Sequence, residues 1–203
     1  MTAHRLDTAQ LRVLGCLIEK QRTTPDAYPL SLNSLRLACN QATNRDPVLD
    51  LGEPEVREAV QRLSQIGWVR LASGPGSRAA KYRQLFEESL GLDPAETAVL
   101  GLLFLRGPQT AAELKARSER LHAFDSSDDV ADTLQRLEAR ELAQLLPRRP
   151  GQREERWTHL LTDDSPGEEP AAAGTAPASL EQRLASIEER LDALERGVVD
   201  FPS

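Results

Sequence analysis

The chain has 203 residues, of which only 4% are aromatic, and its formal net charge is −7. No apolar run approaches the roughly 20 residues of a membrane-spanning helix, and the N-terminus lacks the charged-then-apolar pattern of a secretion signal. The composition therefore predicts a cytoplasmic protein with no membrane partner. The acidity is uneven, because residues 163–203 carry 3 basic and 10 acidic residues, which accounts for the whole net charge.

Two helices are expected before residue 42. The first begins after Asp7, a good N-cap residue, and ends near Lys20 to Arg22. The second runs from Leu32 to about Gln41, with Ser31 as its N-cap. A polar loop follows, in which Asn44, Arg45 and Asp46 before Pro47 are typical of turns.

Residues 52–86 predict one helix that leads directly into a hairpin. Gly52 and Pro54 mark the start of the helix, and Gly67 is placed to end it. The strands are expected at Trp68–Ala72 and about Ala80–Leu85, joined by a Gly- and Pro-rich turn. A helix followed by a two-stranded "wing" is the half of a winged helix that usually meets DNA.

The same unit recurs later in the chain. Aligning Asp7 with Asp93 gives six identities in 14 positions, and aligning Val56 with Val130 matches VREAVQRL to VADTLQRL. The two offsets, 86 and 74, show that the first copy has 12 extra residues between its first and third helices. We place this insertion at residues 28–51, where a role specific to the first copy could have been added.

The expected fold is mainly α with small β-hairpins (α+β), organised as tandem winged-helix domains at residues 1–90 and 91–162. Residues 163–178 predict a flexible acidic linker, and residues 179–198 a coiled-coil-like helix that joins copies of the chain into a homo-oligomer. The charges beside its heptad seam favour parallel pairing, and the alternative is a helix that packs on its own domains. The seam residues are Leu180, Leu184, Ile187, Leu191 and Leu194.

Several long strings resemble the YceH-like family of uncharacterised bacterial proteins. They include LIEKQRTTPDAYPLSLNSLRLACNQATNRDPV at residues 17–48, GSRAAKY in the first wing and PGQREERWTHL in the second. The resemblance covers about residues 6–161 and implies two winged-helix modules. It implies no activity and no ligand, so no functional residue follows from it.

Catalysis and cofactor binding have little support in the sequence. His4, His122 and His159 are not spaced with Cys, Asp or Glu as a metal site or catalytic triad requires. Cys16 and Cys39 lie in apolar helical stretches, which predicts reduced core thiols. We therefore expect a protein that is not an enzyme and has no catalytic residue, metal or cofactor.

Binding to double-stranded DNA is the first functional hypothesis, since basic residues lie on the wing and on the exposed side of the third helix. Acidic residues at the start of that helix oppose it, because they would repel phosphate. The alternative is an adaptor whose winged helices dock another protein, with the polar insertion 40–50 as one contact surface. The candidate DNA contacts are Arg57, Gln61, Arg62, Arg70, Arg78, Lys81 and Arg83.

Overall fold

Helix α1 (Thr8–Thr23) begins as predicted, because the Asp7 carboxylate accepts a hydrogen bond from the backbone N–H of Gln10 at 2.8 Å. The structure is a computed structural model that describes residues 4–72, 80–148 and 154–162. The chain divides into two compact units, Met1–Pro166 and Gly167–Ser203, and the described residues all belong to the first. The predicted linker and coiled-coil helix lie outside the described residues.

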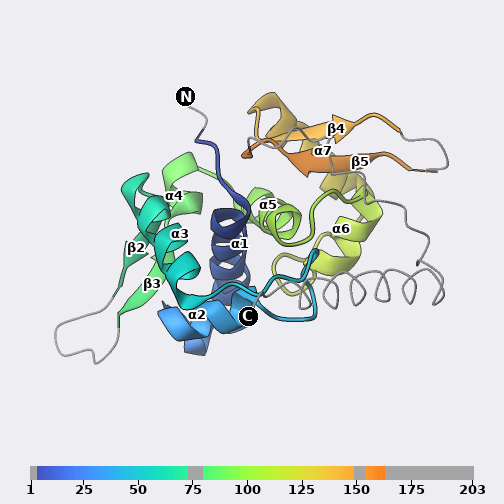
Figure 1. Cartoon of the computed structure of the whole chain (residues 1–203). Helices are drawn as coiled ribbons and strands as arrows, with labels where there is room; N and C mark the ends of the chain where they lie inside the picture. Colours follow the sequence, from blue (N-terminus) through green and yellow to red (C-terminus); the bar gives the residue numbers. More distant parts are fainter. Residues whose placement is uncertain (1–3, 73–79, 149–153, 163–203) are drawn as a thin grey trace, which may run out of the picture. The chain divides into compact units, whose positions relative to one another are not determined.

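Among the described residues, the first half adds three α-helices, a short 3-10 helix and a small antiparallel sheet to α1 (Figure 1). The strand order is β1-β3-β2, so β3 lies in the middle. The elements are η1 (Pro25–Ala27), β1 (Leu30–Ser31), α2 (Leu32–Cys39), α3 (Glu53–Gln65), β2 (Val69–Leu71), β3 (Lys81–Gln84) and α4 (Phe86–Leu90).

Three features of this half differ from the sequence prediction. The expected hairpin gains a third strand, because Leu30 pairs with Tyr82 across a long sequence separation that local patterns do not reveal. Helix α2 ends at Cys39 instead of near Gln41. The short helix α4 was not predicted, since it has no capping side chain and depends on burial of Phe86 in the core.

The second half contains α5 (Pro94–Arg106), α6 (Ala111–Ser118) and α7 (Ser127–Ala139), followed by the antiparallel strands β4 (Ala143–Leu146) and β5 (Arg156–His159). Each helix begins with a capping box, in which an N-cap side chain and the residue three positions later satisfy each other's backbone N–H. The fold is therefore mixed α+β with small antiparallel sheets, as predicted.

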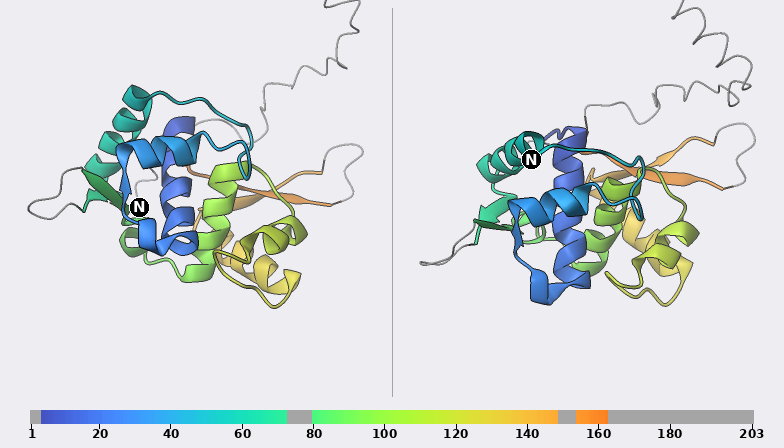
Figure 2. Two further views of the ribbon diagram at one scale, coloured as in Figure 1. Left: turned by 90° about the horizontal axis from the view of Figure 1, so that it is seen from below. Right: turned by 60° about the horizontal axis from the view of Figure 1, so that its bottom comes forward.

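The two halves share one hydrophobic core, in which α1 and α5 lie side by side (Figures 1 and 2). The helices approach closely at a glycine on each. A Cβ added at Gly15 would lie 2.9 Å from Leu105 Cγ and 3.2 Å from Phe104 Cβ, and one at Gly101 would lie 2.9 Å from Ile18 Cγ2. The offset of 86 residues relates Gly15 to Gly101 and Ile18 to Phe104, so the two copies of the repeat meet at equivalent positions.

We expect Gly15→Ala to destabilise the protein by about 1–3 kcal/mol, the usual cost of overpacking a core. Helix propensity alone predicts that the same change raises the free energy of unfolding by up to about 1 kcal/mol, so the two effects have opposite signs. Urea denaturation of Gly15→Ala and of the unmodified protein shows which effect is larger. As a control, the second substitution Leu105→Ala returns space to the new methyl group, and Gly15→Ala should cost less in that background. A more stable Gly15→Ala protein would contradict the close contact.

Candidate nucleic-acid interface

Basic side chains gather on the outer face of the three-stranded sheet. Side chains alternate between the two faces of a strand, and Val69 and Gln84, which pair with each other, are buried on the inner face. Arg70 and Arg83, the next pair, therefore lie on the outer face, directly opposite each other. Lys81 is two residues from Arg83 and shares that face. The structure thus brings together three of the predicted DNA contacts.

The pairing of Arg70 with Arg83 is unfavourable on its own, because like charges directly opposite in a sheet repel. Arg83 is partly neutralised by Glu88, with an Nη2–Oε1 distance of 2.6 Å. Arg70 is exposed and has no hydrogen-bond or ion-pair partner in the described part of the chain. An anion placed over this face would relieve the repulsion.

The three candidates on α3 are exposed, as predicted, but they do not converge. Arg57 and Arg62 are five positions apart, which places them about 140° apart around the helix. Arg62 contributes to a concave surface with His4 and Gln10, near the start of α1. Arg57 lies on the opposite edge of the exposed side of α3, and Gln61 lies between Arg57 and Arg62 around the helix.

Each arginine of α3 is bound to a carboxylate one turn earlier. Arg57 Nη2 lies 2.5 Å from Glu53 Oε1, and Arg62 Nη2 lies 2.8 Å from Glu58 Oε1. Such exposed pairs contribute little to stability, so either arginine can exchange its carboxylate for a phosphate. Glu55 instead caps the helix, since its carboxylate accepts the Gly52 N–H at 2.6 Å. The acidic start of α3 therefore has a structural explanation.

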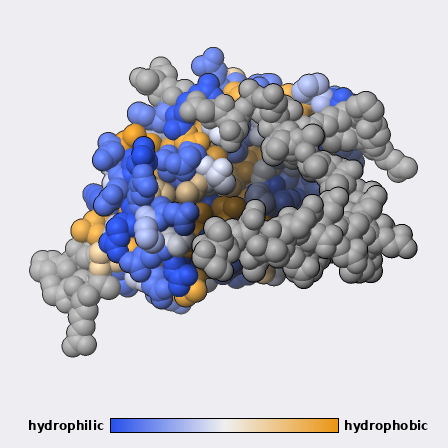
Figure 3. All heavy atoms as spheres, viewed as in Figure 1, coloured by the Kyte–Doolittle hydropathy of each residue, from blue (hydrophilic) through white to orange (hydrophobic). Residues whose placement is uncertain are grey.

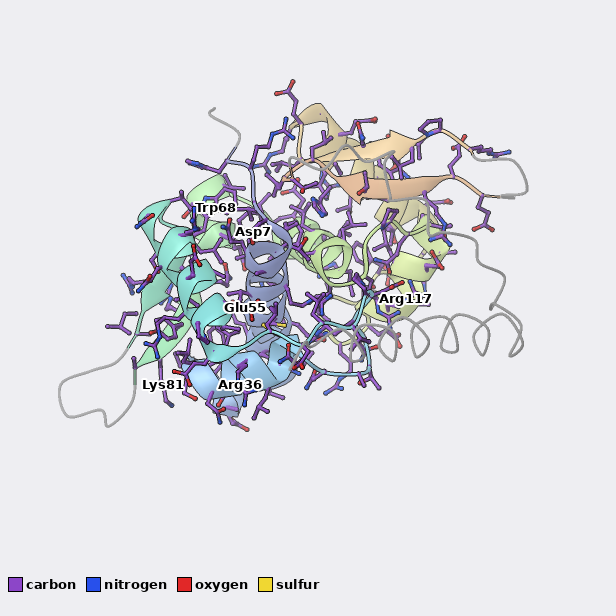
Figure 4. The ribbon with its side chains drawn as sticks, viewed as in Figure 1. Asp7, Arg36, Glu55, Trp68, Lys81 and Arg117 are labelled. Carbon is purple, nitrogen blue, oxygen red and sulfur yellow. The ribbon has the colours of Figure 1, made fainter. Side chains whose placement is uncertain are left out.

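The view with side chains shows how these groups are distributed. Lys81 lies on the hairpin, whereas Glu55 lies on the side of α3 that faces α1 (Figure 4). Arg78 and all five predicted seam residues lie outside the described residues, so the structure does not test them.

The surface over α2, α3 and the sheet is largely hydrophilic, with separate hydrophobic spots (Figure 3). The large exposed apolar side chains of this half are Leu37, Val48 and Leu71, which come from α2, the following loop and β2. Single exposed apolar residues are ordinary on protein surfaces.

The loop at residues 40–51, which includes the predicted polar insertion 40–50, is mostly exposed but is anchored to the protein through one buried side chain and several hydrogen bonds. The Arg45 side chain is fully buried and forms a two-pronged ion pair with Glu19 of α1, at 3.1 and 2.7 Å. Asn44 accepts a hydrogen bond from Arg106, and the Asp46 N–H donates to the Leu105 carbonyl. The loop therefore connects α1 with the end of α5 in the second half.

Sequence reasoning assigned Arg45 to a turn and missed its role in the core. Glu19 and Arg12, its neighbours in the fold, were not singled out either. One weak signal in the sequence pointed to these buried charges. Arg12 and Glu19 lie seven residues apart on the first helix, so they fall on the same side of it, where hydrophobic residues are expected.

No group of His, Cys, Asp and Glu side chains suited to a metal ion occurs among residues 4–72, 80–148 and 154–162. Within the same residues, no helix is long and apolar enough to cross a membrane. His159 is buried in β5 against Phe104, with a ring-centroid distance of 5.1 Å. The described residues thus form a mixed α+β protein with an internal repeat. Its three-stranded sheet carries basic side chains on the outer face.

Comparison with known proteins places the chain in a family. A family model described as "Protein of unknown function, DUF480" matches residues 6–152. A UPF0502 protein of Xanthomonas campestris pv. campestris (strain B100) is 54% identical over 159 residues, which are 78% of this chain and 71% of the relative. A UPF0502 protein of Pseudomonas fluorescens (strain SBW25) is 50% identical over 159 residues, or 78% and 72%. The chain belongs to this DUF480/UPF0502 family of uncharacterised bacterial proteins.

Proposed function

We propose that the chain consists of two winged-helix modules and binds double-stranded DNA through the wing of the first. The order of elements in the first half supports the winged-helix interpretation, because a short strand, two helices and a hairpin follow α1 and the strand pairs with the hairpin. The second half repeats the three helices and the hairpin. On this interpretation α3 is the recognition helix and β2–β3 is the wing.

The observation that carries the proposal is the arginine pair on the wing. Arg70 and Arg83 face each other across two strands and share their face with Lys81. A phosphate backbone carries regularly spaced negative charge, and arginine binds phosphate oxygens through two N–H groups at once. The wing therefore supplies affinity that does not depend on sequence, while Gln61 at the centre of the exposed side of α3 is the residue that can read a base.

Arg70→Gln and Arg83→Gln should each weaken binding to mixed-sequence duplex DNA and lower the salt dependence of log K by about 1, the change expected for one lost phosphate contact. Glu88→Gln should strengthen binding, because it releases Arg83 from its carboxylate partner. Fluorescence anisotropy titrations at several salt concentrations measure both effects.

Arg120→Gln is the matched control, since Arg120 is exposed beyond α6 and far in sequence from the wing. This variant should leave the affinity unchanged. Opposite effects of Arg83→Gln and Glu88→Gln separate a contact with DNA from a structural role of their ion pair, which both changes would break alike. Absence of any DNA binding by the unmodified chain at low salt would refute the proposal.

A second candidate function is docking of another protein. It is favoured by a concave surface of about 430 Å³ between the start of α1, the 40–51 loop and α3. Leu49, Leu51 and Ala59 line it with apolar groups, and Glu55 and Glu58 add negative charge. Its occupant would be a peptide with basic and apolar side chains. The DNA titration discriminates the two, because an acidic docking surface confers no affinity for DNA.

A further inference from the structure

Three arginines from three different elements surround the turn between α5 and α6. Arg106 ends α5, Arg117 lies on α6 (Figure 4) and Arg156 begins β5. Arg156 Nη1 donates to the Pro108 carbonyl at 2.7 Å, and Arg117 Nη1 donates to the side-chain oxygen of Gln109 at 2.6 Å. The guanidinium groups of α6 and β5 are therefore held at the turn that directly follows Arg106.

Gln109 fixes the geometry of this turn. The residue is only 1% exposed, and its Nε2 donates to the carbonyls of Leu102 and Gly107 at 3.1 and 3.3 Å. Its backbone exchanges two hydrogen bonds with Trp157, at 3.0 and 2.8 Å. Because Arg117 binds this buried amide, its guanidinium has a defined place beside the end of α5.

The negative charge at the turn is less than the positive charge. Among the described residues, only Glu113 forms ion pairs with these arginines. Its Oε2 lies 3.1 Å from Arg156 Nη1, and its Oε1 lies 3.6 Å from Arg117 Nη2. Arg106 instead donates to the Asn44 side chain at 3.1 Å and has no ion-pair partner in the described part of the chain. Three positive charges thus share one carboxylate.

Other acidic side chains in the neighbourhood do not balance this excess. The charge of Asp46 acts on Arg106, but Asp46 is exposed and forms no ion pair among the described residues. Glu155 pairs with Arg148, at 3.6 Å. Burial and then the positive charge of Arg117 lower the pKa of Arg106, as expected for cations that repel each other. The first turn of α6 adds its own partial positive charge.

The internal repeat places a cation at the same position in the first half. Ser31, the N-cap of α2, pairs with Lys81 of β3. In the second half the antiparallel bridge at Gln109, continued by one residue, places Thr110, the N-cap of α6, opposite Arg156. Each half therefore carries a basic side chain across from the N-cap of α2 or α6, and the first of these is already a candidate DNA contact.

We propose that Arg106, Arg117 and Arg156 form a phosphate-binding site in the second half, through which the chain makes a second contact with the DNA backbone. The contact with DNA rests on the proposed function, whereas the site itself can be tested with phosphate alone. Arginine binds phosphate oxygens through paired N–H groups. A phosphate among the three guanidinium groups supplies the negative charge that Glu113 alone does not provide.

The first experiment titrates the full chain with inorganic phosphate and follows its backbone amide resonances, with sodium chloride at equal ionic strength as the reference. The resonances of Gly107 and Gln109 should shift and saturate with phosphate only. Arg106→Gln should weaken this binding. Glu113→Gln should strengthen it, because glutamine still offers an oxygen to the Thr110 N–H but no longer competes for the arginines.

The second experiment repeats the DNA titrations with the triple variant in which Arg106, Arg117 and Arg156 are replaced by glutamine. The salt dependence of log K should fall by about 1, the change expected for one lost phosphate contact, and the loss should add to that of Arg83→Gln. Lys115→Gln is the matched control. It removes the same charge from α6, but two positions from Arg117, which is about 160° around the helix. Circular dichroism of each variant establishes that it is folded.

The outcomes separate this inference from the proposed role of the wing. Phosphate binding that is unchanged in Arg106→Gln, or weakened in Glu113→Gln, would overturn the site. A triple variant that binds DNA normally, while Arg83→Gln binds weakly, would overturn the second contact and leave the wing proposal standing. The reverse result would overturn the wing and support the second contact. Phosphate binding at the turn by a chain that does not bind DNA would overturn the DNA contact and assign the site to a free phosphate.

Discussion

Replacing Arg45 by methionine is expected to lower the free energy of unfolding by about 3–5 kcal/mol, the range measured when one partner of a buried ion pair is removed. The guanidinium makes five hydrogen bonds, two to Glu19 and one each to Ala38, Gln41 and Asn44. Its loss leaves the Glu19 carboxylate in the core with Lys20 as its remaining cation. The lost bonds to loop residues also detach the 40–51 loop from α1.

Urea denaturation of Arg45→Met beside Arg57→Met tests this expectation. The Arg57–Glu53 pair has similar chemistry but is more than half exposed on both side chains, so its loss should change stability by no more than about 0.5 kcal/mol. The double variant Arg45→Met/Glu19→Met should regain most of the lost stability, because the Glu19 carboxylate is then no longer left in the core without Arg45. Equal effects of the two arginine substitutions would contradict the buried pair.

The parts of this fold that the sequence predicts are those set by neighbours in the chain. The caps at Asp7 and Ser31 each accept the backbone N–H three positions later, so a local pattern reveals them. The alignment of the two copies also pairs Gly15 with Gly101, and the structure places both glycines where α1 and α5 meet. Hairpin boundaries were correct to within one or two residues.

The parts that could not be predicted depend on residues far apart in the chain. Arg45 and Glu19 are separated by 26 residues, and nothing local distinguishes a turn arginine from one that enters the core. The same holds for Arg70 and Arg83. The sequence predicted that both were candidate contacts, but only the strand register shows that they face each other.

The arrangement also changes the interpretation of the insertion in the first copy. Most of the described hydrogen bonds of residues 40–51 to other elements are made to α1, α2 and α5, while Leu49 and Leu51 of the same loop line the concave surface beside α3. Through Asn44 and Asp46 the loop ties the first half to the end of α5. Its effect on the wing can be measured directly, by repeating the DNA titration with Arg45→Met.

The second large effect concerns acid. His159 is buried in β5, where its Nδ1 accepts the Leu161 N–H at 3.3 Å, and burial lowers the pKa of its imidazole to about 4. In the unfolded chain the pKa returns to about 6.5. The unfolded state therefore binds a proton below about pH 6.5 that the folded state does not bind until about pH 4. Stability from this residue is complete above pH 6.5 and declines as the pH falls to about 4.

The expected loss from pH 7 to pH 4 is about 3 kcal/mol, since each unit of pKa difference corresponds to about 1.4 kcal/mol. Carboxylates also titrate at the acidic end of this range, so the informative quantity is the difference in unfolding free energy between the unmodified protein and His159→Gln. Glutamine keeps a hydrogen-bond acceptor for the Leu161 N–H but carries no titrating proton. Between pH 7 and pH 4, the unfolding free energy of the unmodified protein should fall by about 3 kcal/mol relative to that of His159→Gln. Parallel stability curves for the two proteins would show that His159 takes up its proton equally well in the folded state, and that its burial against Phe104 does not hold it neutral.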